Sequence, residues 1–199
     1  MTSNQRNWAV FFTAFAATGL TAIAFFSSVG IDDESSRIAL FLSARIAFVI
    51  LLLIFVARPL HQMFVTPATL KLVRNRRLLG IAFAGIHTAH LGLIIHRART
   101  FDDFEFSLVT NLPGMLTYVV IYLLFATSFN ATTKMLGPRN WKILHKVGLF
   151  WIFAAFAQTQ LPDSLDKLDD MNWLLATLIV VAVIIRTTAY LARRRRISP

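Results

Sequence analysis

The chain alternates between long apolar blocks and short polar segments. Six blocks are long enough to cross a membrane as helices, because about 20 apolar residues span a hydrocarbon core of about 30 Å. They cover residues 8–28, 38–57, 77–97, 108–129, 141–161 and 172–192. Since these blocks use most of the 199 residues, the pattern predicts one all-α integral membrane domain over 1–199, folded as a six-helix transmembrane bundle.

Two of the blocks carry features that affect where their helices begin. The first runs from Trp8 to Phe26 and is longer than the apolar core of about 7–15 residues in a secretory signal peptide, so we expect it to be a retained helix. Pro113 lies early in the fourth block, where it is expected to kink the helix or shift its start. Residues 111–114 alternatively form a short entry loop.

The composition also belongs to a membrane protein. Hydrophobic residues make up 56% of the chain and charged residues 15%, with a mean hydropathy of +0.62. Soluble domains average about 45–50% apolar and about 25% charged residues. The chain has no cysteine, which excludes disulfides and thiolate-bound metals or clusters.

The charges are sorted along the chain. All ten acidic residues lie in three polar segments: Asp32, Asp33 and Glu34; Asp102, Asp103 and Glu105; Asp163, Asp166, Asp169 and Asp170. Basic residues fill the alternate segments and the ends: Arg6; Arg58, Lys71, Arg74, Arg76 and Arg77; Lys134, Arg139, Lys142 and Lys146; Arg193, Arg194, Arg195 and Arg196. Because Lys and Arg mark the cytoplasmic side, both termini are predicted to be cytoplasmic. The net charge of +10 is therefore explained by the orientation of the chain in a lipid bilayer. The sequence contains no nucleic-acid recognition module, so nucleic-acid binding is not expected.

Imidazoles lie inside two of the predicted spans, where polar side chains are costly and usually functional. His87 and His90 share one face of the third span, about 15–20 Å beyond Arg77 at about 1.5 Å per residue. His145 begins the fifth span near its inner end. Gln158 lies about 20 Å further toward the outside on the same helix. His90 and Gln158 are thus expected at similar outer depth, with His145 at inner depth.

Two interpretations of these imidazoles stay open on the residues alone. Histidine is a common axial ligand of haem iron, and bundles build cofactor sites from facing helices. The alternative is that the imidazoles form hydrogen bonds to neighbouring helices. Arg45 interrupts the second span, where it either snorkels outward or meets a buried carboxylate such as a haem propionate. Arg186 is expected to snorkel toward the basic tail, and His61 to be either a solvated loop residue or part of a surface that faces the lipid headgroups.

Other chemistry finds little support. The sequence has no Gly-rich phosphate loop or dinucleotide fingerprint, so a built-in NAD or flavin domain is not expected. The acids all lie outside the spans, which argues against a Ser-His-Asp triad. A transporter is also disfavoured, because the spans carry no carboxylate and no inverted repeat is evident.

Three stretches resemble the ferric reductase-like transmembrane domain family: "ARIAFVILLLIFVARPL", "VRNRRLLGIAFAGIHTAH" and "LGPRNWKILHKVGLFW". Within that family the chain is most similar to the haem-binding membrane subunits of bacterial periplasmic methionine sulfoxide reductase systems. The resemblance implies a b-type haem protein of the bacterial inner membrane, an oxidoreductase or electron-transfer subunit. Electrons would come from a cytoplasmic flavin reductase with FMN or from quinone, and pass to a periplasmic redox partner.

By the same resemblance His90 and His145 are the haem ligands, but the family's second histidine on the fifth span is replaced by Gln158. An amide is a poor iron ligand, and the inner position faces Arg76, which cannot coordinate. Three outcomes stay open. Haem is held by His90 alone; or His87 and His145 serve together; or the chain is a haem-free, non-catalytic membrane partner or assembly subunit in which Gln158 forms a hydrogen bond to His90.

Overall fold

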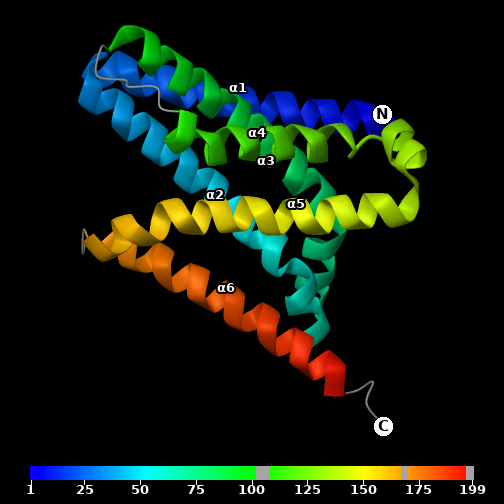
Figure 1. Ribbon diagram of the computed structural model, residues 1–199. Helices are drawn as coiled ribbons and strands as arrows, with labels where there is room; N and C mark the ends of the chain where they lie inside the picture. Colours follow the sequence, from blue (N-terminus) through cyan, green and yellow to red (C-terminus); the bar gives the residue numbers. More distant parts are fainter. Residues whose placement is uncertain (102–107, 167–169, 196–199) are drawn as a thin grey trace.

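The computed structural model describes residues 1–101, 108–166 and 170–195, with side chains placed at 1–101, 111–159 and 173–195. Within these ranges the chain is all-helical, without a β-strand, which confirms the predicted fold class (Figure 1). The six helices are α1 (Ser3–Val29), α2 (Asp33–Met63), α3 (Pro67–Thr100), α4 (Leu108–Ala126), α5 (Asn130–Asp166) and α6 (Asp170–Arg195).

Polar capping residues extend the first three helices beyond their apolar blocks. Thr2, Asp32 and Thr66 each form a capping box with the residue three positions on. The backbone N–H of Ser35 donates to Asp32 Oδ1 at 2.7 Å, and this hydrogen bond lowers the pKa of Asp32 below its usual value. Pro67 follows the Thr66 cap at the start of α3, where its missing N–H costs nothing.

The prediction of a basic loop between the second and third spans is wrong, because helices occupy most of this segment. Only residues 64–66 separate α2 from α3, and the basic residues assigned to that loop lie in the two helices: Arg58, Lys71, Arg74, Arg76 and Arg77. His61, expected in the loop, lies in the last turn of α2, where its Nδ1 is 3.0 Å from Thr69 Oγ1. A helical hairpin with a short connection thus replaces the longer polar loop, and these cations lie on helices.

The second half of the chain contains a sharp break. Pro113 lies inside α4, so the alternative entry loop at residues 111–114 is wrong. The backbone of α5 departs from helical geometry at Gly137, where φ is 72°, a conformation that glycine adopts readily. The stretch 138–166 beyond this break contains the predicted fifth span. Across the short connection between α4 and α5, the two helices meet at 106°.

Length and composition identify membrane-spanning candidates. Within the described residues four helices qualify, namely α1, α2, α3 and the Trp173–Arg195 part of α6. The bent α4–α5 pair adds at most one more, which gives up to five. The coarser form of the prediction, a helical protein with several membrane-spanning helices, therefore holds.

The helices pack around α2 and α3. α2 contacts α1, α3, α5 and α6, and its Phe48 and Leu51 are almost completely buried. α3 also lies against α1, and the backbone of α1 comes close to α3 at Gly85. A Cβ at Gly85 would collide with the backbone carbonyl of Phe11 and lie 3.2 Å from both Ala14 Cβ and Phe15 N. This position on α3 therefore has no room for a side chain.

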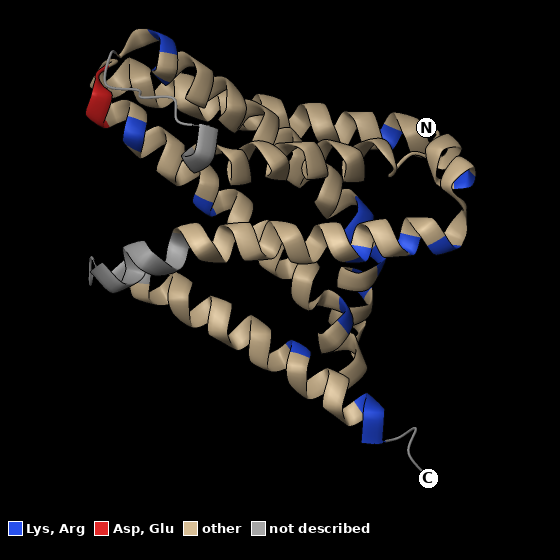
Figure 2. Ribbon diagram, viewed as in Figure 1, with Lys and Arg blue, Asp and Glu red and all other residues tan. Residues whose placement is uncertain are grey.

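Charge separates the two ends of the bundle in the part of the chain that the structure describes. The acids gather where α2 begins, whereas most Lys and Arg lie where α1, α3 and α5 begin and α6 ends (Figure 2). Asp33 accepts from Arg37 at 2.6 Å and from Arg97 at 2.5 Å, which ties the start of α2 to the end of α3. The other acidic clusters lie outside the residues with described side chains: Asp102, Asp103, Glu105, Asp163, Asp166, Asp169 and Asp170.

Candidate functional site

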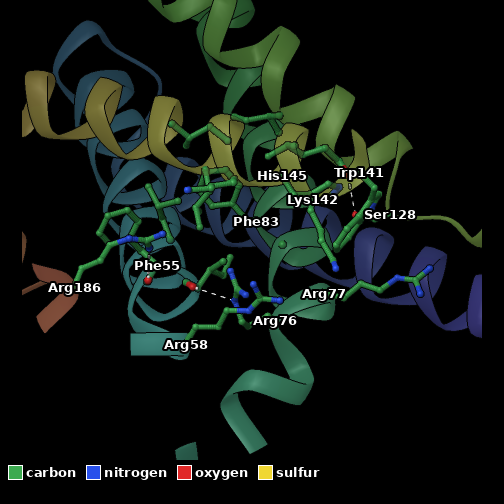
Figure 3. Close-up of a pocket in the computed structure, with 18 of the residues that line it drawn as sticks. Phe55, Arg58, Arg76, Arg77, Phe83, Ser128, Trp141, Lys142, His145 and Arg186 are labelled. Atoms are coloured by element: carbon green, nitrogen blue, oxygen red, sulfur yellow. Dashed lines mark hydrogen bonds between the residues drawn. The ribbon is translucent and has the colours of Figure 1, made fainter. Parts of the chain in front are cut away.

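A cavity of about 440 Å³ lies between the helices near the basic end of the bundle (Figure 3). Its volume falls in the range of about 300–1,000 Å³ that small-molecule and cofactor pockets occupy. The walls are largely apolar and come from α2, α3, α4 and α5: Leu51, Ile54, Phe55, Gly80, Phe83, Ile121, Leu124, Leu149 and Ile152. One imidazole, that of His145, also lines it.

The charged side chains that line this cavity are all positive. Among the described residues, seven cations and no carboxylate form its wall: Arg58, Arg76, Arg77, Lys142, Lys146, Arg186 and Arg193. Three of them, Arg76, Arg77 and Arg186, are partly buried, and the other four are exposed. We call the first three the deep cations and the other four the rim cations.

Two deep cations are held by neutral groups. Arg76 Nε donates to the carbonyl oxygen of Ile54 at 3.2 Å (Figure 3). Arg186 Nη1 donates to the carbonyl oxygen of Phe55 at 2.8 Å, and its guanidinium lies 4.2 Å from the ring centroids of both Phe55 and Phe150. The expectation that Arg186 snorkels toward the tail is therefore wrong. The carbonyl oxygen of Phe55 on α2 and the rings of Phe55 and Phe150 hold it between α2 and α5 instead.

The third deep cation, Arg77, joins three segments of the chain. Its Nη1 and Nη2 both donate to Asn130 Oδ1 at 3.2 Å. Asn7 of α1 is fully buried and donates to the carbonyl oxygen of Ser128 at 3.3 Å. With its amide in the opposite orientation, Asn7 instead accepts from Arg77 Nη2 at 2.9 Å. Arg77 on α3 is therefore tied to the first residue of α5 beside the cavity, and in the second orientation of Asn7 also to α1.

His145 is oriented by two neighbours. Its Nε2 is 3.0 Å from Thr127 Oγ1, and its ring stacks on Trp141 with a centroid distance of 4.2 Å. Trp141 Nε1 in turn donates to the carbonyl oxygen of Thr127 at 2.9 Å. Arg76 lines the same cavity as His145, so the structure places the two side chains in one site. An imidazole held by Thr127 and Trp141 thus shares a largely apolar cavity with a guanidinium.

His87 and His90 form a separate polar cluster further along α3. His90 Nδ1 is 2.8 Å from Ser43 Oγ, and no hydrogen bond of His90 Nε2 occurs among the described residues. The ring centroid of His87 lies 5.7 Å from that of His90 and 5.9 Å from that of Tyr118. In the same region His87 Nδ1 and the Tyr118 hydroxyl are buried without a described hydrogen-bond partner. Buried polar atoms are usually paired, so these two mark a place with unmet hydrogen-bonding capacity.

One aromatic side chain connects the cavity with this cluster. Phe83 lines the cavity, and its ring centroid is 4.3 Å from that of His87. The ring of His87 in turn lies next to that of His90, with 5.7 Å between the centroids. A continuous series of rings therefore runs along α3 from the cavity toward the opposite end of the bundle.

Two other residues named from the sequence stand apart from the cavity. The guanidinium of Arg45 lies 3.4 Å from the ring centroid of Phe41, one turn closer to the start of α2. The side chain of Gln158 is exposed, and no described hydrogen bond joins it to His90. His87 is not a lining residue, so the structure does not place it in the same cavity as His145.

No protein-family model, curated protein or solved structure matches this chain. Within the described residues no group of three or more His, Asp or Glu side chains is arranged to hold a metal ion. The function of the site must therefore be argued from its own geometry.

Proposed function

We propose that this chain is an integral protein of the bacterial inner membrane that binds b-type haem in the cavity and passes electrons toward an extracytoplasmic acceptor. Six spans with both termini in the cytoplasm are part of this proposal, and the Lys and Arg that lie where α1 begins and α6 ends support a cytoplasmic place for the termini (Figure 2). The observation that carries the proposal is the cavity itself. It combines apolar walls, one imidazole and deep guanidinium groups without any described carboxylate.

The chemistry of the lining residues fits haem. A porphyrin is a flat apolar ring with one iron and two carboxylates, and the lining residues offer a complement to each part. The aliphatic and aromatic walls would receive the ring, and Arg76 and Arg186 carry guanidinium donors, which match carboxylates well. Bound haem would supply an iron centre that gains and loses single electrons.

His145 would be the iron ligand in the cavity. Coordination through Nε2 requires the Thr127 hydroxyl to release that nitrogen, because the two atoms are now 3.0 Å apart. The stacked ring of Trp141 would keep the imidazole in place. Since Arg76 cannot coordinate, the iron would have one protein ligand on this side of the bundle.

His90 would be the ligand of any outer haem. A hydroxyl on Nδ1 is the kind of outer-shell partner that orients metal-bound histidines, and Ser43 supplies it. The exposed side chain of Gln158 does not complete a pair with His90. The ring series through Phe83 and His87 supports electron passage along α3. The donor, a flavin reductase with FMN or a quinone, and the periplasmic redox partner follow from the resemblance alone.

The second candidate function is that of a haem-free membrane partner or assembly subunit. Two observations favour it: His145 Nε2 already has a hydrogen-bond partner, and Gln158 stands exposed where a second ligand is needed. In that case the imidazoles serve only to join helices.

Electron passage across a sealed membrane separates the two candidates. The purified protein is reconstituted into vesicles that enclose ferricyanide, and an impermeant reductant is added outside. We expect the enclosed ferricyanide to be bleached in vesicles with the protein at a rate well above that in protein-free vesicles. Equal rates in both preparations, with haem bound, would contradict outward electron transfer. Equal rates with no haem bound would favour the haem-free partner.

A further inference from the structure

The cavity carries more positive charge than haem can neutralise. Seven cationic side chains line it, whereas b-type haem carries two carboxylates. The deep cations are sufficient for those carboxylates. The rim cations then remain without a counter-ion, and they form a group of their own: Arg58, Lys142, Lys146 and Arg193.

The rim cations have no anionic partner in the described structure. None of the four forms a hydrogen bond or ion pair with another described residue, and the described ion pairs all involve Asp33 at the other end of the bundle. Three helices contribute them: α2, α5 and α6. Cations from separate helices that converge without carboxylates repel one another, and an anion bound between them would remove that repulsion.

An apolar groove continues from one of these cations. Lys146 lines both the cavity and a second, shallower depression on α5. The rest of this groove is apolar and exposed: Ile143, Val147, Phe150 and Trp151. A ligand that used both features would carry negative charge at one end and a long apolar chain at the other.

We propose that the rim cations bind the phosphate of an anionic phospholipid, whose acyl chain lies in the α5 groove. Basic pockets between membrane helices on the cytoplasmic side are known receptors for anionic headgroups, and Arg and Lys both bind phosphate well. The proposed topology places the rim at the cytoplasmic leaflet. The lipid site does not require haem, because the rim cations are distinct from the residues assigned to it.

Native mass spectrometry of the full chain in detergent tests the proposal. The protein is titrated with phosphatidylglycerol or with phosphatidylcholine of the same chain length. We expect phosphatidylglycerol to stay bound at concentrations at which phosphatidylcholine does not. The double substitution Arg58→Gln and Lys146→Gln should weaken phosphatidylglycerol binding at least about tenfold, since each basic residue contributes about 1 kcal/mol near an anionic surface.

The matched control is the double substitution Lys134→Gln and Arg139→Gln. These two cations are exposed near the same end of the bundle but do not line the cavity, and their removal changes the net charge equally. Lipid binding should be unchanged in this control. An equal loss in both double variants would show general charge attraction and overturn the site.

Two further measurements distinguish a phospholipid headgroup from free inorganic phosphate as the ligand. Val147→Gln should weaken lipid binding, because it places an amide in the acyl groove. Inorganic phosphate should compete only weakly with the lipid. Full displacement by inorganic phosphate would instead indicate a free-phosphate site and contradict the lipid assignment. Unchanged lipid binding in Val147→Gln would contradict the place proposed for the acyl chain and overturn the proposal. Haem content is measured in every sample, so that loss of haem with lipid retained contradicts the proposed function alone.

Discussion

Replacing His145 by alanine should remove haem from the purified protein. His145 is the only imidazole that lines the described cavity, and Arg76 in the same cavity cannot take its place as a ligand. Loss of an outer-shell partner costs about 10–100-fold in metal affinity, and loss of the ligand itself should exceed that. The measurement is the haem-to-protein ratio by absorption after purification with added haem.

Three further variants distinguish loss of the iron ligand from unfolding of the protein. His145→Gln keeps a side chain that can form a hydrogen bond with Thr127 but offers a poor iron ligand, so it should also lose haem. His96→Ala, at the far end of α3, should retain haem because His96 does not line the cavity. His90→Ala should retain cavity haem. If haem is instead lost in His90→Ala and kept in His145→Ala, the ligand assignment is wrong and the outer cluster is the haem site.

Replacing Gly85 by alanine should destabilise the bundle strongly. The added methyl group would meet the Phe11 carbonyl and the α1 backbone, which cannot move aside as a flexible side chain can. Overpacking of this kind costs about 1–3 kcal/mol or more, because α1 and α3 must separate. The measurement is the temperature at which helical content is lost in detergent, and Gly85→Ala should lower it by several degrees.

The matched control for Gly85 is Gly92→Ala on the same helix. Nothing lies within 4 Å of a Cβ placed there, and alanine has the higher helix propensity. Stability should therefore be unchanged or slightly higher. If the two variants behave alike, the close approach of α1 to α3 is absent from the protein in detergent.

The helix interiors could be predicted from the sequence, but not their ends. Apolar blocks define the segment that must leave water, and each of the six predicted spans lies largely within one helix. Their ends depend on local hydrogen bonds instead. Thr66 and Pro67 start α3 well before the apolar block that begins at residue 77, so a segment read as loop is helix. Hydropathy does not show where a helix is capped, whereas the Thr66-Pro67 pair indicates the start of α3.

The depth of the polar residues along the helices could also be predicted from the sequence, because each helical residue adds a fixed rise along the axis. The direction of each side chain was not. Gln158 was expected at a depth similar to that of His90, and one of three open outcomes joined the two by a hydrogen bond, but the side chain of Gln158 is exposed. Arg186 was expected to point toward the tail, but the rings of Phe55 and Phe150 draw it inward.

The cavity as a whole could not be predicted, because residues from separate helices combine to form it. Helix packing brings Arg58, Arg76 and Arg186 together from α2, α3 and α6. One sequence signal did point to this site: an arginine interrupts the last apolar block at residue 186. A lone cation in an apolar span implies an internal partner, and that partner proved to be the backbone carbonyl and aromatic ring of Phe55 on the cavity wall.

The most direct test of the central claim is the absorption spectrum of the unmodified protein, purified in detergent after expression with ample haem. The cavity predicts a strong Soret band that shifts on reduction with dithionite, with haem in stoichiometric amount. A folded but colourless protein under the same conditions would contradict the haem assignment and leave the haem-free membrane partner as the better description.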